Sequence, residues 1–137
     1  MLSKLLRSSL LGERRTRAAD WPGVAEALRA GAAFLAQGAS YSYLRARSGI
    51  MGPSLFQDPA FGAALEVCKW EGFGMAAQDL TLMLEADARP LMGRERRGVA
   101  AAVGALYRDA LALEPLPPHR AAVGWDDLIA AFEARAA

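Results

Sequence analysis

Apolar side chains recur at steps of three and four residues in three long stretches of the chain, which is the spacing of one face of an α-helix. These stretches lie within residues 20–49, 58–90 and 93–115, and a shorter one follows at residues 125–137. The first pattern runs through Val24, Leu28, Ala32, Leu35, Ala39, Ser42 and Ala46. The last two run through Val99, Val103, Leu106, Ala110 and Leu113, and through Trp125, Leu128, Ile129 and Phe132. The chain is therefore predicted to form three long helices and a short C-terminal helix.

Residues that favour helix ends stand at the borders of these stretches. Asp20 precedes Pro22, and Asp58 precedes Pro59, so each long helix has an N-capping carboxylate ahead of a proline in its first turn. Pro90 cannot continue the second helix, because proline lacks the backbone N–H that the helix needs. We therefore expect the second helix to cover residues 58–90.

The second stretch is apolar on more than one side. One stripe passes through Phe61, Leu65, Cys68, Gly72, Met75, Asp79, Leu82 and Ala86, and another through Trp70, Phe73, Ala77, Leu80 and Leu84. Polar residues are left mainly at Glu71, Gln78, Thr81 and Glu85. Since a helix that is apolar on several sides is usually buried on several sides, we expect this helix at the centre of the fold.

Composition also favours an all-α protein. The 137 residues include thirty alanines, the best helix-forming residue, whereas valine, isoleucine and threonine are scarce. A chain of this length usually forms one domain, and we expect residues 20–137 to form one compact helical bundle after a separate segment, residues 1–19. The single cysteine, Cys68, cannot form an internal disulfide, which suits a reducing compartment. We therefore expect a cytoplasmic protein.

The N-terminal segment is basic and amphipathic. Leucines gather on one side of it and basic residues elsewhere: Leu2, Leu5, Leu6 and Leu10, with Lys4, Arg7, Arg14 and Arg15. Such a segment can lie on an anionic membrane surface, which would place the protein at the inner face of a membrane. The alternatives are that it folds onto the bundle or frays at the end of the chain.

The connection between the first two helices is unusually apolar. Ile50, Met51, Leu55 and Phe56 all fall within residues 49–57. Either these side chains cover one end of the bundle, or they form an exposed surface that binds a partner. Both interpretations stay open at this point.

Two glycines and one carboxylate stand out inside the second helix. Gly72 and Gly74 each cost about 1 kcal/mol relative to alanine, so close approach of another helix is expected there. Asp79 lies on the apolar stripe and needs a partner, for which we consider Arg45, Arg47 or Arg108. The alternative is a ligand cavity lined by Gly72, Gly74 and Asp79.

Candidate chemistry is sparse. The only histidine, His119, lies 51 residues from Cys68, so these two residues have no zinc-binding spacing, and Cys68 has no evident base. No phosphate-binding or nucleophile motif is present. We therefore expect no catalytic residue, no metal and no cofactor. A net charge of +1 also argues against nucleic acid as a partner.

These observations favour a non-enzymatic protein-interaction or adaptor module with a protein partner, and they leave homodimerisation open. Peripheral membrane attachment through the N-terminal segment is one alternative. A small-molecule-binding protein or enzyme, with an apolar cavity between the first two helices, is the other.

Overall fold

The computed structural model describes residues 20–91, 93 and 96–137. Its helices are α2 (Trp21–Ser48), α3 (Gly52–Leu55), α4 (Pro59–Ala88), α5 (Arg96–Ala112) and α6 (Asp126–Ala136). Short 3-10 turns stand at Gly49–Met51, Arg89–Leu91 and Pro118–Arg120. These described ranges contain no strand, so the all-α prediction is confirmed. The N-terminal segment, including all eight of its proposed membrane residues, lies outside the described residues.

The helix ends that the sequence marked are present. The Asp20 side chain accepts a hydrogen bond from the Gly23 amide at 2.9 Å, and Asp58 accepts one from the Ala60 amide at 2.9 Å. These carboxylates satisfy amides that the first turn of a helix leaves free. α4 ends at Ala88, just ahead of the turn that contains Pro90. The capping chemistry therefore fixes where both long helices begin.

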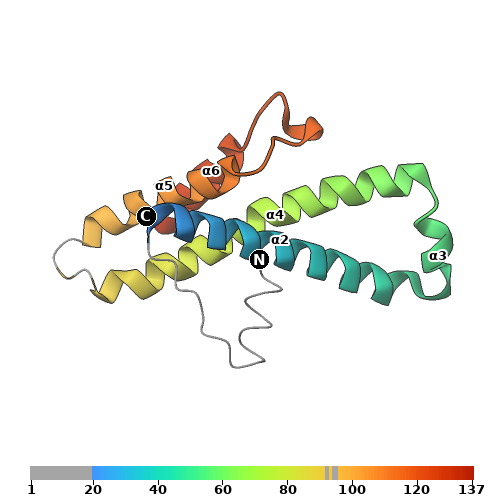
Figure 1. Ribbon diagram of the computed structural model, residues 1–137, viewed down its shortest axis with the longest axis horizontal. Coiled ribbons are helices and arrows are strands. Elements are labelled where there is room, and N and C mark those ends of the chain that lie inside the picture. The colour runs from blue at the N-terminus through green and yellow to red at the C-terminus, as the bar shows by residue number, and fades with distance from the viewer. Residues whose placement is uncertain (1–19, 92, 94–95) are drawn as a thin grey trace.

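Three long helices pack together, and α6 completes the bundle. α2 and α4 run in opposite directions and cross, while α5 packs against both of them and α6 packs against α4 and α5 (Figure 1). The core between them contains large side chains from three of the helices, including Phe73, Val103, Tyr107, Leu111 and Phe132. The buried Tyr107 hydroxyl donates a hydrogen bond to the Gly74 carbonyl oxygen at 2.9 Å, which ties α5 to α4.

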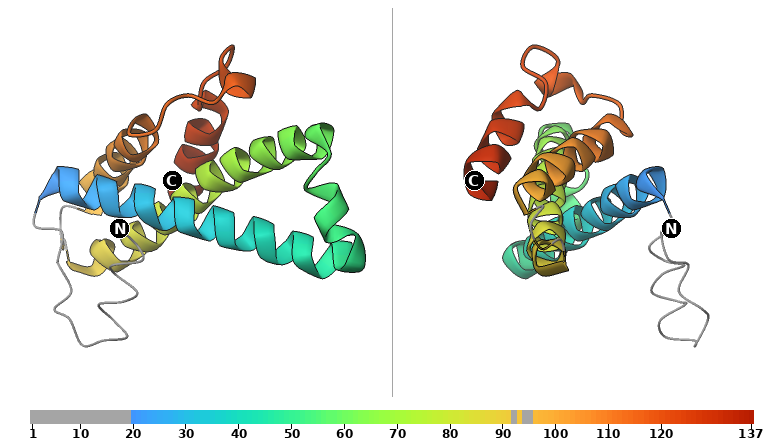
Figure 2. Two further views of the ribbon diagram at one scale, coloured as in Figure 1. Left: turned by 45° about the vertical axis from the view of Figure 1, so that its right-hand side comes forward. Right: turned by 90° about the vertical axis from the view of Figure 1, so that its left-hand side faces the viewer.

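The other end of α2 and α4 projects from the bundle as a hairpin. Beyond their crossing the two helices diverge, and α3 joins their ends, so the three elements outline a triangle (Figure 2). After Ser40, α2 contains no buried residue, and the first buried residue of α4 is Phe73. We call this part, from Tyr41 to Trp70, the outer hairpin.

The predicted core faces of the long helices were right in part. In α5, Val99, Val103, Leu106 and Ala110 are buried as predicted, whereas Leu113 is half-exposed. In α2, Leu28 and Ala32 are buried, but the buried face continues through Ala36 and Ser40. Leu35, Ala39, Ser42 and Ala46 are exposed instead. The outer half of the predicted α2 stripe therefore faces solvent.

In α4 several predictions about single residues were wrong. Cys68, Met75 and Asp79 were placed on a buried stripe, but all three are exposed. Gln78, Thr81 and Glu85, which were taken as the solvent-facing residues, are buried. The Gln78 amide donates to the Leu128 carbonyl oxygen at 2.9 Å, the Thr81 hydroxyl donates to the Ala77 carbonyl oxygen at 2.7 Å, and Arg89 donates to Glu85 at 2.7 Å. Burial of these polar groups is tolerated because each has a hydrogen-bond partner.

Asp79 also has a different partner from those considered. Its carboxylate pairs with Arg135 of α6 at 3.0 Å, and both side chains are more than half exposed. Arg108, one of the three arginines considered for it, pairs with Glu133 of α6 instead. Asp79 therefore belongs to a surface contact between α4 and α6, which contributes little to stability.

Candidate functional site

The apolar connection between α2 and α4 lies at the tip of the outer hairpin. Gly49 ends α2 with φ of 50°, a conformation that glycine adopts without strain. Met51 is 64% exposed and Phe56 is 48% exposed, while Leu55 is partly buried. The side chain of Ile50, the fourth predicted binding residue, lies outside the described part of the structure. The loop thus leaves two of its large apolar side chains in solvent.

Phe56 connects the loop to both long helices. Its ring stacks on Tyr41 of α2 with centroids 6.2 Å apart, and it meets Phe61 of α4 edge-on at 5.5 Å. Beside Tyr41 and Phe56 lies a pocket of about 530 Å³, which Arg45, Ser48 and Pro53 help to line. We call this hollow the tip pocket.

An exposed stripe of α2 leads into the tip pocket. Phe34, Gly38, Tyr41 and Arg45 follow one another at helical spacing, on the side of α2 that faces away from α4. Phe34 is 45% exposed, and in the described part of the chain nothing lies within 4 Å of the position that a Cβ on Gly38 would occupy. We call this stripe, together with Phe56, the docking face. Its α2 residues were not singled out from the sequence as a binding surface, although their spacing was visible there.

The charged residues that α2 places beside the docking face have one sign, and the exposed Asp58 comes only after the loop, at the start of α4. Between Ala30 and Gln57 the sequence contains two charged residues, Arg45 and Arg47, and both are positive. Both lie in the last turn of α2 and are exposed, at the helix end whose dipole favours cations. The docking face is therefore apolar along α2 and basic at the tip.

A second hollow lies on the opposite side of α2, between the diverging arms of the outer hairpin. It has a volume of about 410 Å³ and is lined by Ala39, Ser40, Tyr43 and Leu44 of α2 and by Phe61, Ala64, Leu65 and Cys68 of α4. The Ser40 hydroxyl and the Cys68 thiol are 3.9 Å apart in its wall. We call it the apolar groove, since no charged side chain stands among these lining residues.

None of the three hollows described in this section is lined by Gly72, Gly74 or Asp79, the residues of the predicted cavity. A Cβ on Gly72 would stand 3.5 Å from Ala36, and one on Gly74 would stand 2.5 Å from Leu128 and 3.0 Å from Trp125. Gly74 therefore lets Leu128 and Trp125 pack closely on α4, whereas at Gly72 a methyl group would make an ordinary van der Waals contact with Ala36. The apolar groove does lie between the first two long helices, but further out along them.

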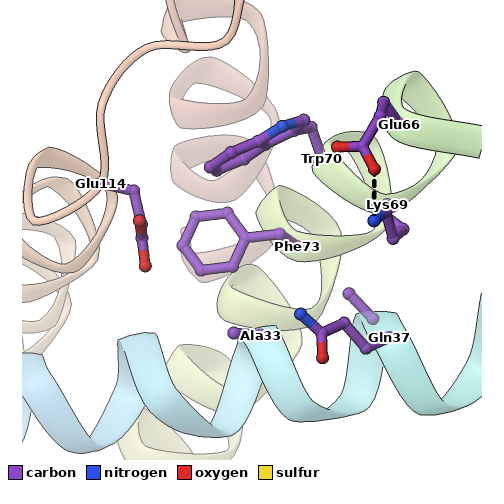
Figure 3. Close-up of a pocket in the computed structure, with 8 residues that line it drawn as sticks. Ala33, Gln37, Glu66, Lys69, Trp70, Phe73 and Glu114 are labelled. Atoms are coloured by element: carbon purple, nitrogen blue, oxygen red, sulfur yellow. Dashed lines mark ion pairs between the residues drawn. The ribbon is translucent and has the colours of Figure 1, made fainter. Parts of the chain in front are cut away.

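A third, smaller pocket lies between α2, α4 and the chain that follows α5 (Figure 3). Its volume is about 260 Å³, and the rings of Trp70 and Phe73 meet in its wall at nearly a right angle, with centroids 5.9 Å apart. Its carboxylates already have partners: Glu66 pairs with Lys69, and Glu114 accepts from Arg29 at 2.6 Å. The hydrogen bond to Glu66 raises the pKa of Lys69, which keeps this ammonium charged.

The chain between α5 and α6, residues 113–124, is held to the bundle by one arginine. Arg120 is buried and donates to both oxygens of Glu71 at 2.7 and 2.6 Å, and to Asp127 at 2.6 Å. Its guanidinium carbon also lies 4.6 Å from the ring centre of Trp125, and His119 contacts Glu71 at 2.7 Å. We call these residues the Arg120 cluster, and all of its polar groups are used in fastening the connection.

The Arg120 cluster makes acid sensitivity predictable. Hydrogen bonds from Arg120 hold the pKa of Glu71 and that of Asp127 below their ordinary values. Carboxyl groups with a lowered folded-state pKa stabilise the fold fully above the unfolded pKa, near 4, and lose this contribution as the pH falls through the folded value. We expect the urea midpoint to fall as the pH drops below about 4, and to fall less steeply in Glu71→Gln. An equally steep fall in that variant would contradict this assignment.

No group of three or more potential metal ligands occurs in the described ranges. None of their helices combines the length and apolar character needed to cross a membrane. Comparison of the chain with protein-family models, curated proteins and solved structures finds no match.

Proposed function

We propose that the protein is a non-enzymatic interaction module and that its docking face binds an amphipathic helix of a partner protein. The observation that carries this proposal is the exposed stripe of α2, in which Phe34 and Tyr41 flank Gly38 and lead to Phe56 and the tip pocket. Helix-in-groove recognition uses such anchors at helical spacing. Gly38 supports the same proposal, because a glycine within a helix costs about 1 kcal/mol and none of the described residues comes within 4 Å of the position that its Cβ would occupy.

Charge argues for the kind of partner. A helix that places its apolar side on Phe34 and Tyr41 would bring its flanks near Arg45 and Arg47, and α2 itself contributes no carboxylate beyond Glu26. The partner helix should therefore carry aspartate or glutamate beside its apolar side. The protein's own residues 1–17 fit this chemistry poorly, since they carry five basic residues and one acidic residue.

Designed peptides would test the proposal directly. Two helical peptides would share the same leucine side, and one would carry glutamates on its flanks where the other carries lysines. Fluorescence anisotropy with the full chain should show binding of the glutamate peptide, and this binding should weaken as salt is added. Equal binding of both peptides, or binding of neither, would overturn the proposal.

Variants would locate the binding surface. Phe56→Ala and the pair Arg45→Glu with Arg47→Glu should each weaken binding of the glutamate peptide about tenfold or more, because anchor side chains contribute most of the binding energy and the reversed charges repel the peptide. Arg108→Glu is the matched control, since this exposed arginine lies on α5 and pairs with Glu133. Weakening of the same size in the control would show that the docking face has no special role.

A small gain in stability should accompany a loss of binding at one position. Gly38→Ala should stabilise the fold by about 0.5–1 kcal/mol, because alanine favours the helix and the site has room for a methyl group. The same variant should weaken binding of the glutamate peptide, because the added methyl group would keep the peptide backbone from packing closely against residue 38. Gly62→Ala in α4 also has open space, so it should stabilise the fold and leave binding unchanged. Denaturant unfolding and anisotropy would measure the two effects.

A further inference from the structure

The geometry of the apolar groove points to a second site, and we propose that it binds an uncharged small molecule with a hydrocarbon chain. This site is separate from the docking face, because its residues on α2 lie on the opposite side of that helix. Leu44 of α2 and Phe61 and Leu65 of α4 are its largest aliphatic and aromatic lining residues apart from Tyr43. The inference does not depend on the peptide-binding role.

The lining selects against charge. Among the eight lining residues none is acidic or basic, so a carboxylate or ammonium placed in the groove would lose hydration without gaining an ion pair there. A hydrocarbon chain has no such hydration to lose, and its transfer from water into the groove is favourable by about 0.8 kcal/mol for each buried CH₂ group. A chain with a neutral polar end therefore matches the groove better than a fatty-acid anion does.

The groove also contains a few groups that suit a neutral polar end. Tyr43, Ser40 and Cys68 supply two hydroxyls and a thiol among otherwise apolar lining residues. Among the described residues, the Ser40 hydroxyl has only the weak 3.9 Å contact with the Cys68 thiol, so it retains hydrogen-bonding capacity for a ligand hydroxyl. A few polar groups in an apolar hollow are typical of small-molecule sites.

Size argues for a small molecule over a second copy of the chain. The volume of about 410 Å³ lies within the usual range of ligand pockets, about 300–1,000 Å³. A stable protein interface needs roughly 20–30 residues on each side, whereas this groove is formed by eight. A ligand would fill the space between two arms in which α2 has no buried residue after Ser40 and α4 has none before Phe73.

Cys68 gives a direct reading of occupancy, because it is the only cysteine of the chain and lies exposed in the groove wall. We would measure its alkylation rate with N-ethylmaleimide, using the full chain and adding hexanol, octanol, decanol or decanoate below their aggregation limits. Decanol should slow alkylation at least fivefold, shorter alcohols should slow it less, and decanoate should protect less than decanol. Calorimetry with decanol should give saturable binding to one site.

Two matched variants locate the effect. Ala64→Trp fills the groove and should abolish decanol binding in calorimetry. Ala63→Trp should retain decanol binding, because Ala63 is an exposed residue one position earlier in α4 that does not line the groove. Binding that survives in Ala64→Trp would overturn the proposal, as would equal protection by decanol and decanoate or no protection at all. Without added alcohol, the alkylation of Cys68 could also become slower as the protein concentration rises, with a doubled mass in light scattering. That result would show that a second copy covers the groove, and it would equally overturn the proposal.

Discussion

Replacing Phe132 with alanine is expected to lower the free energy of unfolding by about 3–5 kcal/mol, the usual cost of deleting a buried aromatic side chain. Phe132 is 1% exposed and is the aromatic residue with which α6 enters the core. Its ring lies 5.3 Å from that of Tyr107, and a Cβ on Gly104 would come within 3.4 Å of it. The space that this side chain leaves would be lined by Tyr107 and Gly104 of α5.

Phe56→Ala is the comparison that gives the Phe132 experiment its meaning. Phe56 is half-exposed on the outer hairpin, so the same deletion should cost about 1 kcal/mol or less there. Urea unfolding of both variants would measure the difference. Losses of similar size would mean that the outer hairpin belongs to the stabilising core, and the docking face would then lose its claim to be a free surface.

The helices themselves could be predicted from the sequence because their signals are local. An N-capping aspartate, a proline in the first turn and a spacing of three to four residues act within a few residues of one another. For this reason Asp20 and Asp58 mark the starts of α2 and α4 correctly. α5 was also assigned correctly, since Val99, Val103 and Leu106 form a single apolar face that only one orientation can bury.

The orientation of α4 was not predictable in the same way. Its apolar residues surround the helix, so the pattern does not say which of them should face the core. The actual buried side contains Gln78 and Thr81. The burial of Gln78 depends on two hydrogen bonds to α6: its side-chain amide donates to the Leu128 carbonyl oxygen, and its side-chain oxygen accepts from Arg135 at 2.5 Å. Those partners are 50 and 57 residues away in the chain, and no short-range pattern connects them to Gln78.

The candidate surfaces were predictable in part for the same reason. The apolar composition of residues 49–57 was a local signal, and it led to Met51 and Phe56. The contribution of α2 became visible only when the fold showed that, within residues 20–91, 93 and 96–137, no helix covers Phe34 or Tyr41. From the sequence alone, an apolar helix face is interpreted as part of the core, because the sequence does not show where the neighbouring helices end. Here α5 and α6 end before they reach this face of α2.

Replacing Arg120 with methionine is the second change for which we expect a large effect, about 2–4 kcal/mol, which corresponds to a fall of roughly 10 °C in the melting temperature. Methionine keeps much of the side-chain volume and removes every hydrogen bond that the guanidinium donates. Glu71 and Asp127 would then face each other without the cation between them, although both carboxylates are partly exposed and can regain some water. The contact with the Trp125 ring would also be lost.

Arg120→Lys should recover only a small part of that loss, because the three N–H groups of an ammonium cannot replace the five hydrogen bonds that the planar guanidinium donates to Glu71, Asp127 and the Gly124 carbonyl oxygen. Arg108→Met removes an exposed pair and should cost about 1 kcal/mol or less. Limited proteolysis gives a second measurement, since residues 113–124 should be cut faster in Arg120→Met than in Arg108→Met. If the two variants unfolded alike and were cut alike, the connection would have to be held by its prolines and by α6 alone, and the Arg120 cluster would then be a surface feature despite the burial of its arginine.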